Sequence, residues 1–296
     1  MIALTGATGN IGGKIAEILL SMNLKIRCLA RGAEKLEALA AGGAEVLALD
    51  LRGTPALIRA LSGIRVIFTM IPPNYGATDF RAYQNEMGES IATAVEKAGV
   101  KYVVNLSSQG GYLPDGTGPI KGLHDQEERL NRLEGVHILH LRPTYFMENL
   151  LSFADMIQSS NLTGSAIDGD LKIPMIATRD IAAYAAERLV NKDFTGITVK
   201  DLLGQRDLSM NEATRIIGQK IGSPDLKYTR FTYEETRKSM VGAMGLSPDL
   251  AELFVEMSRA INEGMFKTPR TAENTTETAF EDFADVFTHM LSDKAA

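Results

Sequence analysis

The chain has 296 residues, of which 45% are hydrophobic, so it can bury one large core or two smaller ones. Its net charge of -6 and the lack of a Lys/Arg run argue against direct nucleic-acid binding. No apolar stretch is long enough to cross a membrane and no leader pattern is present, so we expect a cytoplasmic protein. Cys28 lies in an apolar run and is expected in the core, and the four scattered histidines predict no metal site.

The N-terminus combines a short strand, a glycine-rich turn and an amphipathic helix. Residues 1–4 are apolar, residues 5–14 read TGATGNIGGK, and apolar residues then recur at helical spacing. Glycines in such a turn permit a tight bend and let backbone amides and the helix N-terminus approach a pyrophosphate. The spacing is G-x-x-G-x-x-G, so an ordinary turn is the alternative. We expect cofactor contacts from Gly6, Thr8, Gly9, Asn10, Ile11 and Gly12.

Strands and helices alternate through the first half of the chain. Strands are predicted at 24–30, 44–49, 66–71, 102–106 and 136–141, and helices at 34–41, 54–61, 79–98 and 125–133. Several strands are apolar on both faces. This pattern predicts an α/β fold, a Rossmann-like doubly wound parallel sheet with helices on both sides. The loop at 109–122 is either a lid or a surface excursion.

The second half is richer in helices. It contains a possible edge strand at 173–177, a helix at 179–191 with Thr178 as N-cap, and a strand at 197–199 that could rejoin the main sheet. Ser209 and Glu212 have capping-box spacing before a helix at 209–221, a strand is possible at 226–231, and three helices follow. We therefore expect a dinucleotide-binding domain at 1–150, joined by 178–202, and a smaller, mostly helical substrate or partner lobe at 151–296.

Five segments together resemble the NmrA-like branch of the atypical short-chain dehydrogenases. They are TGATGNIGG, CLARG, VNLSSQGG, LRPTYFMENLL and IATRDIAAYAAERL, in the family's order. The resemblance implies a Rossmann-like fold that binds NAD(P). The family includes both NAD(P)H-dependent reductases and redox-sensing regulators, so the resemblance supports the cofactor more strongly than a reaction.

The end of the second strand favours NADP(H) over NAD(H). NAD sites usually place a carboxylate there, whereas this chain has Arg31, which could pair with a 2′-phosphate together with Lys35. An ordinary surface arginine is the alternative. Other strand ends supply the remaining expected cofactor contacts, and the turn at 143–146 resembles the family segment that flanks the nicotinamide. These contacts are Asp50, Ile71, Pro72, Ser107, Pro143, Tyr145 and Phe146, of which the two aromatics could instead be core residues.

The usual catalytic Y-x-x-x-K pair is missing after the fifth strand. Ser107 is present, and His124 and Tyr145 are the remaining candidates for proton transfer, although His124 could simply make a local hydrogen bond. A quinone-like acceptor needs less help from a general acid than a ketone does. The favoured function is therefore an NADPH-dependent reductase of a small apolar conjugated acceptor. The alternative is an NADP(H)-sensing regulator that binds a protein partner, and epimerase chemistry ranks last.

Apolar residues of the second half could line a substrate pocket, although packing between the two lobes is the favoured interpretation. They are Met147, Phe153, Met156, Met240, Met244, Leu246 and Met257.

Overall fold

The computed structural model describes residues 1–32 and 36–293, and its centre is a parallel sheet. The sheet has seven strands in the order β10-β6-β5-β4-β1-β2-β3, so the winding direction changes between β1 and β4. The predicted Rossmann-like fold is confirmed. The strands are β1 (Ile2–Thr5), β2 (Ile26–Ala30), β3 (Glu45–Ala48), β4 (Val66–Thr69), β5 (Tyr102–Leu106), β6 (His137–Pro143) and β10 (Ile197–Leu202).

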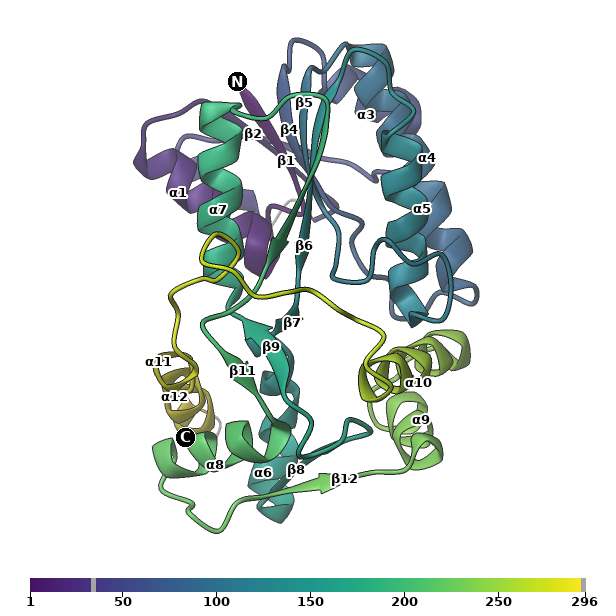
Figure 1. The fold of residues 1–296 in the computed structure, drawn as a ribbon. Coiled ribbons are helices and arrows are strands. Elements are labelled where there is room, and N and C mark those ends of the chain that lie inside the picture. The colour runs from purple at the N-terminus through teal and green to yellow at the C-terminus, as the bar shows by residue number, and fades with distance from the viewer. Residues whose placement is uncertain (33–35, 294–296) are drawn as a thin grey trace.

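Helices cover both faces of this sheet (Figure 1). On one face lie α1 (Asn10–Ser21) and α7 (Thr178–Asn191), and on the other lie α3 (Thr54–Ala60), α4 (Phe80–Ala98) and α5 (Lys121–Leu130). The short helix α2 (Glu37–Ala41) precedes β3, and residues 34 and 35 of the expected helix lie outside the described residues. Cys28 is fully buried, and burial raises the pKa of its thiol to about 11, so it is a core residue.

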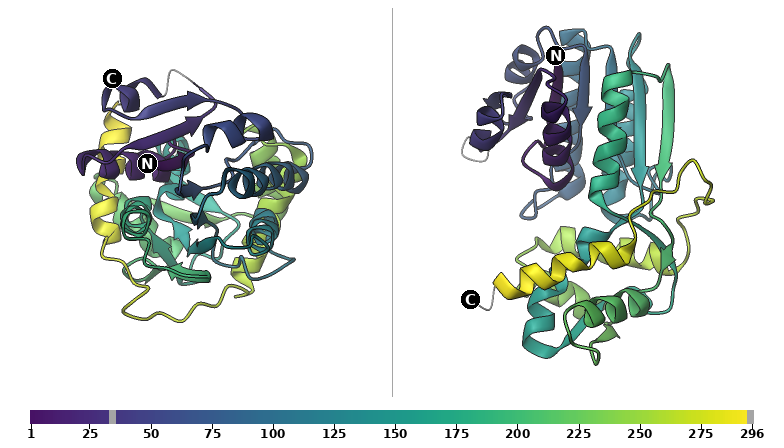
Figure 2. Two further views of the ribbon diagram at one scale, coloured as in Figure 1. Left: turned by 90° about the horizontal axis from the view of Figure 1, so that it is seen from above. Right: turned by 90° about the vertical axis from the view of Figure 1, so that its left-hand side faces the viewer.

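A second lobe lies below the carboxyl ends of the strands (Figures 1 and 2). It has its own hydrophobic core and two small sheets, one of order β11-β9-β7 and one in which β8 pairs with β12. Its strands are β7 (Tyr145–Phe146), β8 (Leu162–Ser165), β9 (Ile173–Ile176), β11 (Asp207–Leu208) and β12 (Lys227–Arg230). Its helices are η3 (Met147–Phe153), α6 (Ala154–Ser160), α8 (Met210–Lys220), α9 (Tyr233–Gly242), α10 (Pro248–Asn262), α11 (Phe280–Phe283) and α12 (Asp285–Asp293).

The chain returns from the second lobe to the main sheet through residues 178–202. There α7 packs on α1, and β10 pairs in parallel with β6 along six residues. The second lobe is therefore built from two stretches of the chain, one before residue 178 and one after residue 202.

One expected edge strand is central. β9 lies between β7 and β11, although Pro174 lacks the N–H that a central strand normally donates. Pro174 is opposite Asp207 of β11, whereas β7 pairs only with Met175 and Ile176. Each half of β9 thus has one partner strand, and the proline is tolerated.

Two helix starts also differ from expectation. The N-cap of α7 is Ala177, and Thr178 is the first helical residue, because the Glu148 carboxylate accepts the Thr178 backbone N–H at 3.0 Å from outside the helix. The helix expected at 125–133 starts at Lys121. A 3-10 turn, η2 (Gly118–Ile120), leads into it, and a Cβ at Gly122 would lie 2.5 Å from Gln84 Cδ. The glycine therefore permits close packing of α5 on α4.

The C-terminal region contains four helices where three were expected, separated by an irregular segment. Residues 263–279, which we term the strap, leave α10, cross the end of the first lobe and return to α11 (Figure 1). Leu203 N donates to the Asn274 carbonyl at 2.7 Å, and Thr276 N donates to the Leu203 carbonyl at 2.8 Å. These bonds fasten the strap to the chain that follows β10.

Candidate functional site

The glycine turn leaves the N-terminus of α1 open. Gly6 has φ +64°, and a Cβ at Gly12 would lie 2.7 Å from the carbonyl carbon of Gly6. Gly9 is the N-cap and has no side chain to satisfy the first amides of the helix, whose first turn carries no acidic residue. Thr8, Gly9 and Asn10 are exposed. An anion could therefore approach these amides directly, as a pyrophosphate requires.

Positive charge lies at the next two strand ends. Arg31 follows β2 and is exposed, and Arg52 donates to both Asp50 carboxylate oxygens, the shortest distance being 2.7 Å. The Arg52 hydrogen bond lowers the pKa of Asp50, and the charge of Arg31 lowers it further. Asp50 thus stays ionised with its charge balanced by Arg52, and the exposed Arg31 remains available to a phosphate. Lys35 lies outside the described residues.

The ends of β1 and β4 are joined by a hydrogen bond and by Met70. Met70 N donates to Thr5 Oγ1 at 2.9 Å, and a Cβ at Gly6 would lie 2.7 Å from Met70 Sδ. Ile71 is buried, and the Pro72 carbonyl accepts a hydrogen bond from the Tyr83 hydroxyl at 2.9 Å. Because Met70 and Ile71 also line the cavity described next, the glycine turn and the cavity are adjacent.

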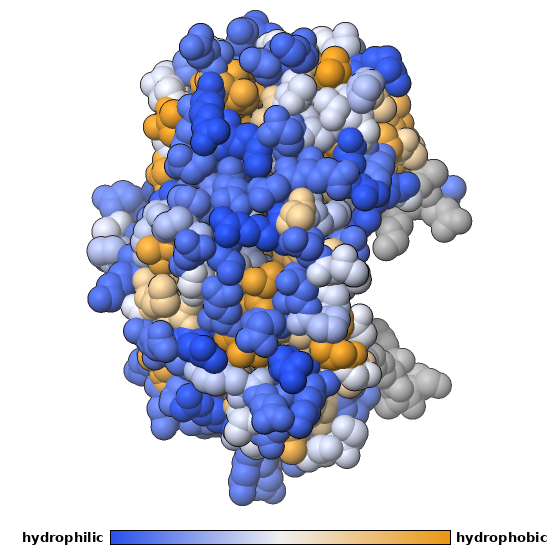
Figure 3. Space-filling model, turned by 90° about the vertical axis from the view of Figure 1, so that its right-hand side faces the viewer, coloured by the Kyte–Doolittle hydropathy of each residue, from blue (hydrophilic) through white to orange (hydrophobic). Residues whose placement is uncertain are grey.

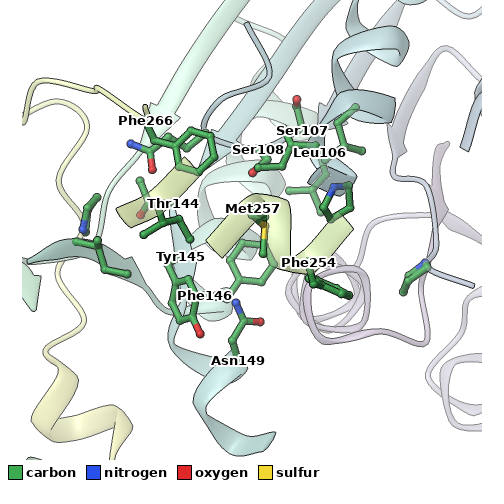
Figure 4. A pocket seen from close by; sticks show the side chains of 18 of the residues that line it. Leu106, Ser107, Ser108, Thr144, Tyr145, Phe146, Asn149, Phe254, Met257 and Phe266 are labelled. Atoms are coloured by element: carbon green, nitrogen blue, oxygen red, sulfur yellow. The ribbon is translucent and has the colours of Figure 1, made fainter. Parts of the chain in front are cut away.

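A cavity of about 400 Å³ lies between the carboxyl ends of β4, β5 and β6 and the second lobe (Figure 4). Its walls are mainly apolar, with aromatic side chains from α4, β7, α10 and the strap. Hydrophobic residues also gather at the surface where the lobes meet, and the outline is indented at that level (Figure 3). The residues that line the cavity include Phe80, Gln84, Ser107, Ser108, Thr144, Tyr145, Phe146, Asn149, Lys172, Phe254, Met257 and Phe266.

The two serines after β5 face different surroundings. In Figure 4 the Ser108 hydroxyl points into the cavity, whereas the Ser107 hydroxyl points away from it. Ser107 Oγ is buried beside Glu127 and has no hydrogen-bond partner of standard geometry. Burial alone would raise the pKa of Glu127, but hydrogen bonds, chiefly from Arg142 at 2.5 Å, leave it below its usual value. Ser108 is therefore better placed to contact a ligand than the predicted Ser107.

Behind these serines lies a buried polar chain. Thr69 donates to Asn105 at 3.1 Å, Asn105 Nδ2 contacts His140 Nδ1 at 3.1 Å, and His140 Nε2 contacts Asn131 Oδ1 at 2.9 Å. Burial lowers the pKa of His140 to about 4. This series of hydrogen bonds runs across β4, β5 and β6 to Asn131 at the end of α5, and none of its members lines the cavity.

His124 does not line the cavity. It lies on α5 in a separate polar hollow with Arg81 and Asp125, and its Nδ1 lies 2.9 Å from the Gly111 carbonyl oxygen. A hydrogen bond from Arg81 lowers the pKa of Asp125. His124 therefore makes a hydrogen bond to the backbone, as the alternative to proton donation expects, and its role in the protein stays a prediction.

Tyr145 and Phe146 form β7 and both line the cavity. Burial raises the pKa of the Tyr145 hydroxyl above its usual value, and no hydrogen-bond partner for this hydroxyl is found among the described residues. Phe146 also packs against the core between the sheet, α1 and α7. Pro143, just before them, ends β6 and accepts a hydrogen bond from Gln109 N at 2.9 Å. The turn thus connects the sheet to the cavity.

Of the seven apolar residues for which a pocket was the alternative to packing between the lobes, only Met257 lines this cavity. Met147 and Phe153 belong to the core of the second lobe. Leu246 belongs to the core between the main sheet and the helices α3, α4 and α5, and Met244 is 55% exposed. The favoured packing interpretation therefore describes most of them. Sequence reasoning missed Phe254, Phe266, Asn149 and Lys172. Phe254 lies three residues before Met257 on α10, and this helical spacing was the available signal.

In residues 1–32 and 36–293, no helix is both long and apolar enough to span a membrane. Within the same ranges, no three His, Cys, Asp or Glu side chains cluster in a way that could hold a metal ion.

The fold and the open glycine turn define a Rossmann-type nucleotide-binding protein, and comparison with known proteins gives the family. The model of the NmrA-like family matches residues 1–284, so the chain belongs to this family of atypical short-chain dehydrogenases. It is 29% identical over 259 residues to the NAD(P)H azoreductase of Xenophilus azovorans, covering 87% of this chain and 86% of that protein. It is 27% identical over 274 residues to quinone oxidoreductase 2 of Escherichia coli (strain K12), covering 89% of each chain.

A solved structure supports the same fold. The NADPH-dependent quinone oxidoreductase of Escherichia coli, crystallised with NADPH, has a TM-score of 0.78 to this chain at 21% identity. The match covers 100% of both chains. The likeness extends across both lobes.

Proposed function

We propose that the protein is an NADPH-dependent reductase of small, apolar, conjugated acceptors such as quinones. The observation that carries this proposal is the apolar cavity beside the glycine turn, because Met70 contacts Gly6 and also lines the cavity. A hydride donor held at the turn and an acceptor in the cavity would therefore be neighbours. The names of the relatives, an azoreductase and a quinone oxidoreductase, describe conjugated acceptors and support the same reading.

The chain offers a binding group for each part of NADPH. The open amides of α1 would hold the pyrophosphate, and Arg31 would pair with the 2′-phosphate. Ile71 and Pro72 would border the adenosine side, and the turn at 143–146 would flank the nicotinamide. Bound NADPH supplies the hydride. The absence of an acid at the end of β2 supports a preference for the phosphorylated cofactor.

The cavity would orient the acceptor and exclude water. Aromatic side chains at Phe80, Phe254 and Phe266 provide flat apolar surface, and the hydroxyls of Ser108 and Tyr145 can donate hydrogen bonds to an acceptor oxygen or nitrogen. Because the pKa of Tyr145 is raised, its hydroxyl stays protonated near neutral pH and acts as a donor, not as a base. A quinone that has accepted a hydride is a hydroquinone monoanion, a stabilised phenolate that needs one proton, and solvent can supply this proton as the product leaves the cavity.

Calorimetry and steady-state kinetics test this function. We expect NADPH and NADP⁺ to bind more tightly than NADH and NAD⁺, and NADPH to be oxidised when 1,4-naphthoquinone is added. Met257→Trp fills the cavity and should lower kcat/KM by at least about tenfold while leaving the Kd of NADPH unchanged. Met244→Trp, on the exposed surface, is the matched control. Failure to bind any of the four nucleotides would refute the proposal.

A second candidate is a regulator that senses NADP(H) and binds a protein partner. One observation favours it: among the described residues that line the cavity there is no histidine and no carboxylate, the side chains that most often transfer protons in enzymes. The same calorimetry separates the two candidates. A strong preference for one redox state, with no oxidation of NADPH by quinones, would support the regulator.

A further inference from the structure

Lys172 is the only charged side chain among the described residues that line the cavity. It immediately precedes β9 and is exposed, so this charge lies at a part of the cavity wall that solvent reaches. Lys121, which follows the lining residue Ile120, is different because its ammonium is paired with Glu256 at 2.9 Å. The cavity thus combines one unpaired positive charge with walls that contain no carboxylate.

The acidic residues nearest to Lys172 in sequence have other partners. Asp168 pairs with Arg230 at 2.7 Å, and Asp170 Oδ1 accepts a hydrogen bond from Asn211 at 2.8 Å. The Lys172 side chain forms no ion pair or hydrogen bond with any described residue. Its charge is therefore available to a ligand.

The backbone before Lys172 is fixed from two directions. Asp168 N donates to the Asn262 side chain of α10 at 2.8 Å, and Asn211 N, at the start of α8, donates to the Gly169 carbonyl at 3.0 Å. After Lys172 the chain enters β9. These contacts hold the backbone at Lys172 in place, so only its flexible side chain must become ordered when a ligand binds.

We propose that Lys172 binds an anionic substituent, a sulfonate or carboxylate, on the acceptor whose conjugated part occupies the cavity. This inference rests on the proposed function and narrows its substrate class to anionic conjugated acceptors. An anion could come from the acceptor or from a phosphate of the cofactor. The acceptor is favoured because Lys172 belongs to the second lobe, whereas the glycine turn belongs to β1 and α1.

Two dyes that differ in one charge test this directly. 1-Anilinonaphthalene-8-sulfonate carries a sulfonate, and N-phenyl-1-naphthylamine is its neutral counterpart. Fluorescence titration should show that Lys172→Met weakens binding of the sulfonate about three- to tenfold and binding of the neutral dye less than about twofold. Lys172→Arg should retain the sulfonate affinity. Lys227→Met, an exposed lysine on β12 outside the cavity, is the matched control and should change neither value.

Three results would overturn the inference. Unchanged sulfonate binding in Lys172→Met would show that the charge is not used. An equal loss for both dyes would assign the lysine stem a packing role. A loss of NADPH affinity as large as the loss for the sulfonate would assign Lys172 to the cofactor. Dye binding needs no turnover, so a protein that oxidises no NADPH would refute the proposed function but would leave this test valid.

Discussion

We propose that Arg31 determines which of the two nicotinamide cofactors binds more tightly. It is exposed at the end of β2, and Asp50, a carboxylate whose charge interacts with Arg31, is already paired with Arg52. We expect Arg31→Ala to weaken NADPH binding by about ten- to a hundredfold, since a charge-assisted hydrogen bond to a phosphate is lost, and to leave NADH binding unchanged. Calorimetric titration of both cofactors measures the ratio.

Arg65 provides the control for this substitution. It is also exposed, but it precedes β4 at the opposite end of the sheet. Arg65→Ala should bind both cofactors as the unmodified protein does. An unchanged NADPH/NADH affinity ratio in Arg31→Ala would remove Arg31 from the cofactor site.

We expect His140 to make the stability of the fold dependent on pH. It is fully buried, and its neutral form, with the proton on Nε2, satisfies both Asn105 and Asn131. The pKa is about 4 in the folded protein and about 6.5 when unfolded, so below pH 6.5 the unfolded chain binds more protons. The free energy of unfolding should therefore fall by up to about 3 kcal/mol between pH 6.5 and 4.

Urea unfolding at several pH values tests this. His140→Gln keeps a polar side chain but cannot titrate, so its free energy of unfolding should depend less steeply on pH, by about one proton over this range. Comparing slopes separates this effect from the general loss of stability that the substitution causes. If the free energy of unfolding changed equally with pH in His140→Gln and in the unmodified protein, His140 would not be the group responsible.

At the scale of the elements, local sequence signals predict a helix well when its capping residues are adjacent to it in the sequence. They miss a helix start that depends on a contact with a residue far away in the sequence. Asp79 accepts from Ala82 N at 2.8 Å and Gly99 ends α4 in a left-handed conformation, so this helix was predicted almost to the residue. The start of α5 was not, because Gly122 is typical of a loop, whereas its role is to contact Gln84 of α4. Similarly, the carboxylate that caps α7 comes from Glu148, thirty residues earlier in the chain.

This distant cap leads to a prediction about α7. Glu148 accepts the Thr178 backbone N–H and its hydroxyl, and its charge lies at the positive end of the helix dipole. Glu148→Ala should lower the free energy of unfolding by about 1–2 kcal/mol, measured by urea denaturation. Glu17→Ala, at an exposed position of α1, should change it by less than about 0.5 kcal/mol. Equal stability of the two variants would show that Glu148 is not a cap.

At the scale of the whole molecule, the sequence predicts one half of the candidate site better than the other. The glycine turn is contiguous in sequence, so its geometry follows from a local pattern. The cavity is not contiguous, because it joins residues after β5 to α10 and to the strap, more than a hundred residues away. Phe266 illustrates this: a Cβ at Gly110 would lie 2.6 Å from its ring, a contact with no signature in either segment. The roles of the individual site residues stay predictions.

The strap should therefore control the size of the acceptor. Phe266 lines the cavity, and the segment around it is fixed by hydrogen bonds from Lys267 N to the Tyr112 hydroxyl at 3.2 Å and from Gln109 to Thr268 at 3.1 Å. Removing the ring enlarges the cavity without releasing the strap, because these bonds do not involve it. We expect Phe266→Ala to raise kcat/KM for a bulky acceptor, such as a sulfonated triphenylmethane dye, relative to 1,4-benzoquinone by about tenfold.

The matched control for this prediction is Phe231→Ala. Phe231 is also half-buried in the second lobe, but it packs on Gly164 and does not line the cavity. Both variants lose a comparable amount of packing, so a change in the ratio of the two kcat/KM values in Phe266→Ala alone would identify the ring as a wall of the acceptor site. The same change in both variants would instead reflect general loosening of the second lobe. No change in either would place the acceptor elsewhere, since an acceptor that fills this cavity must contact the strap.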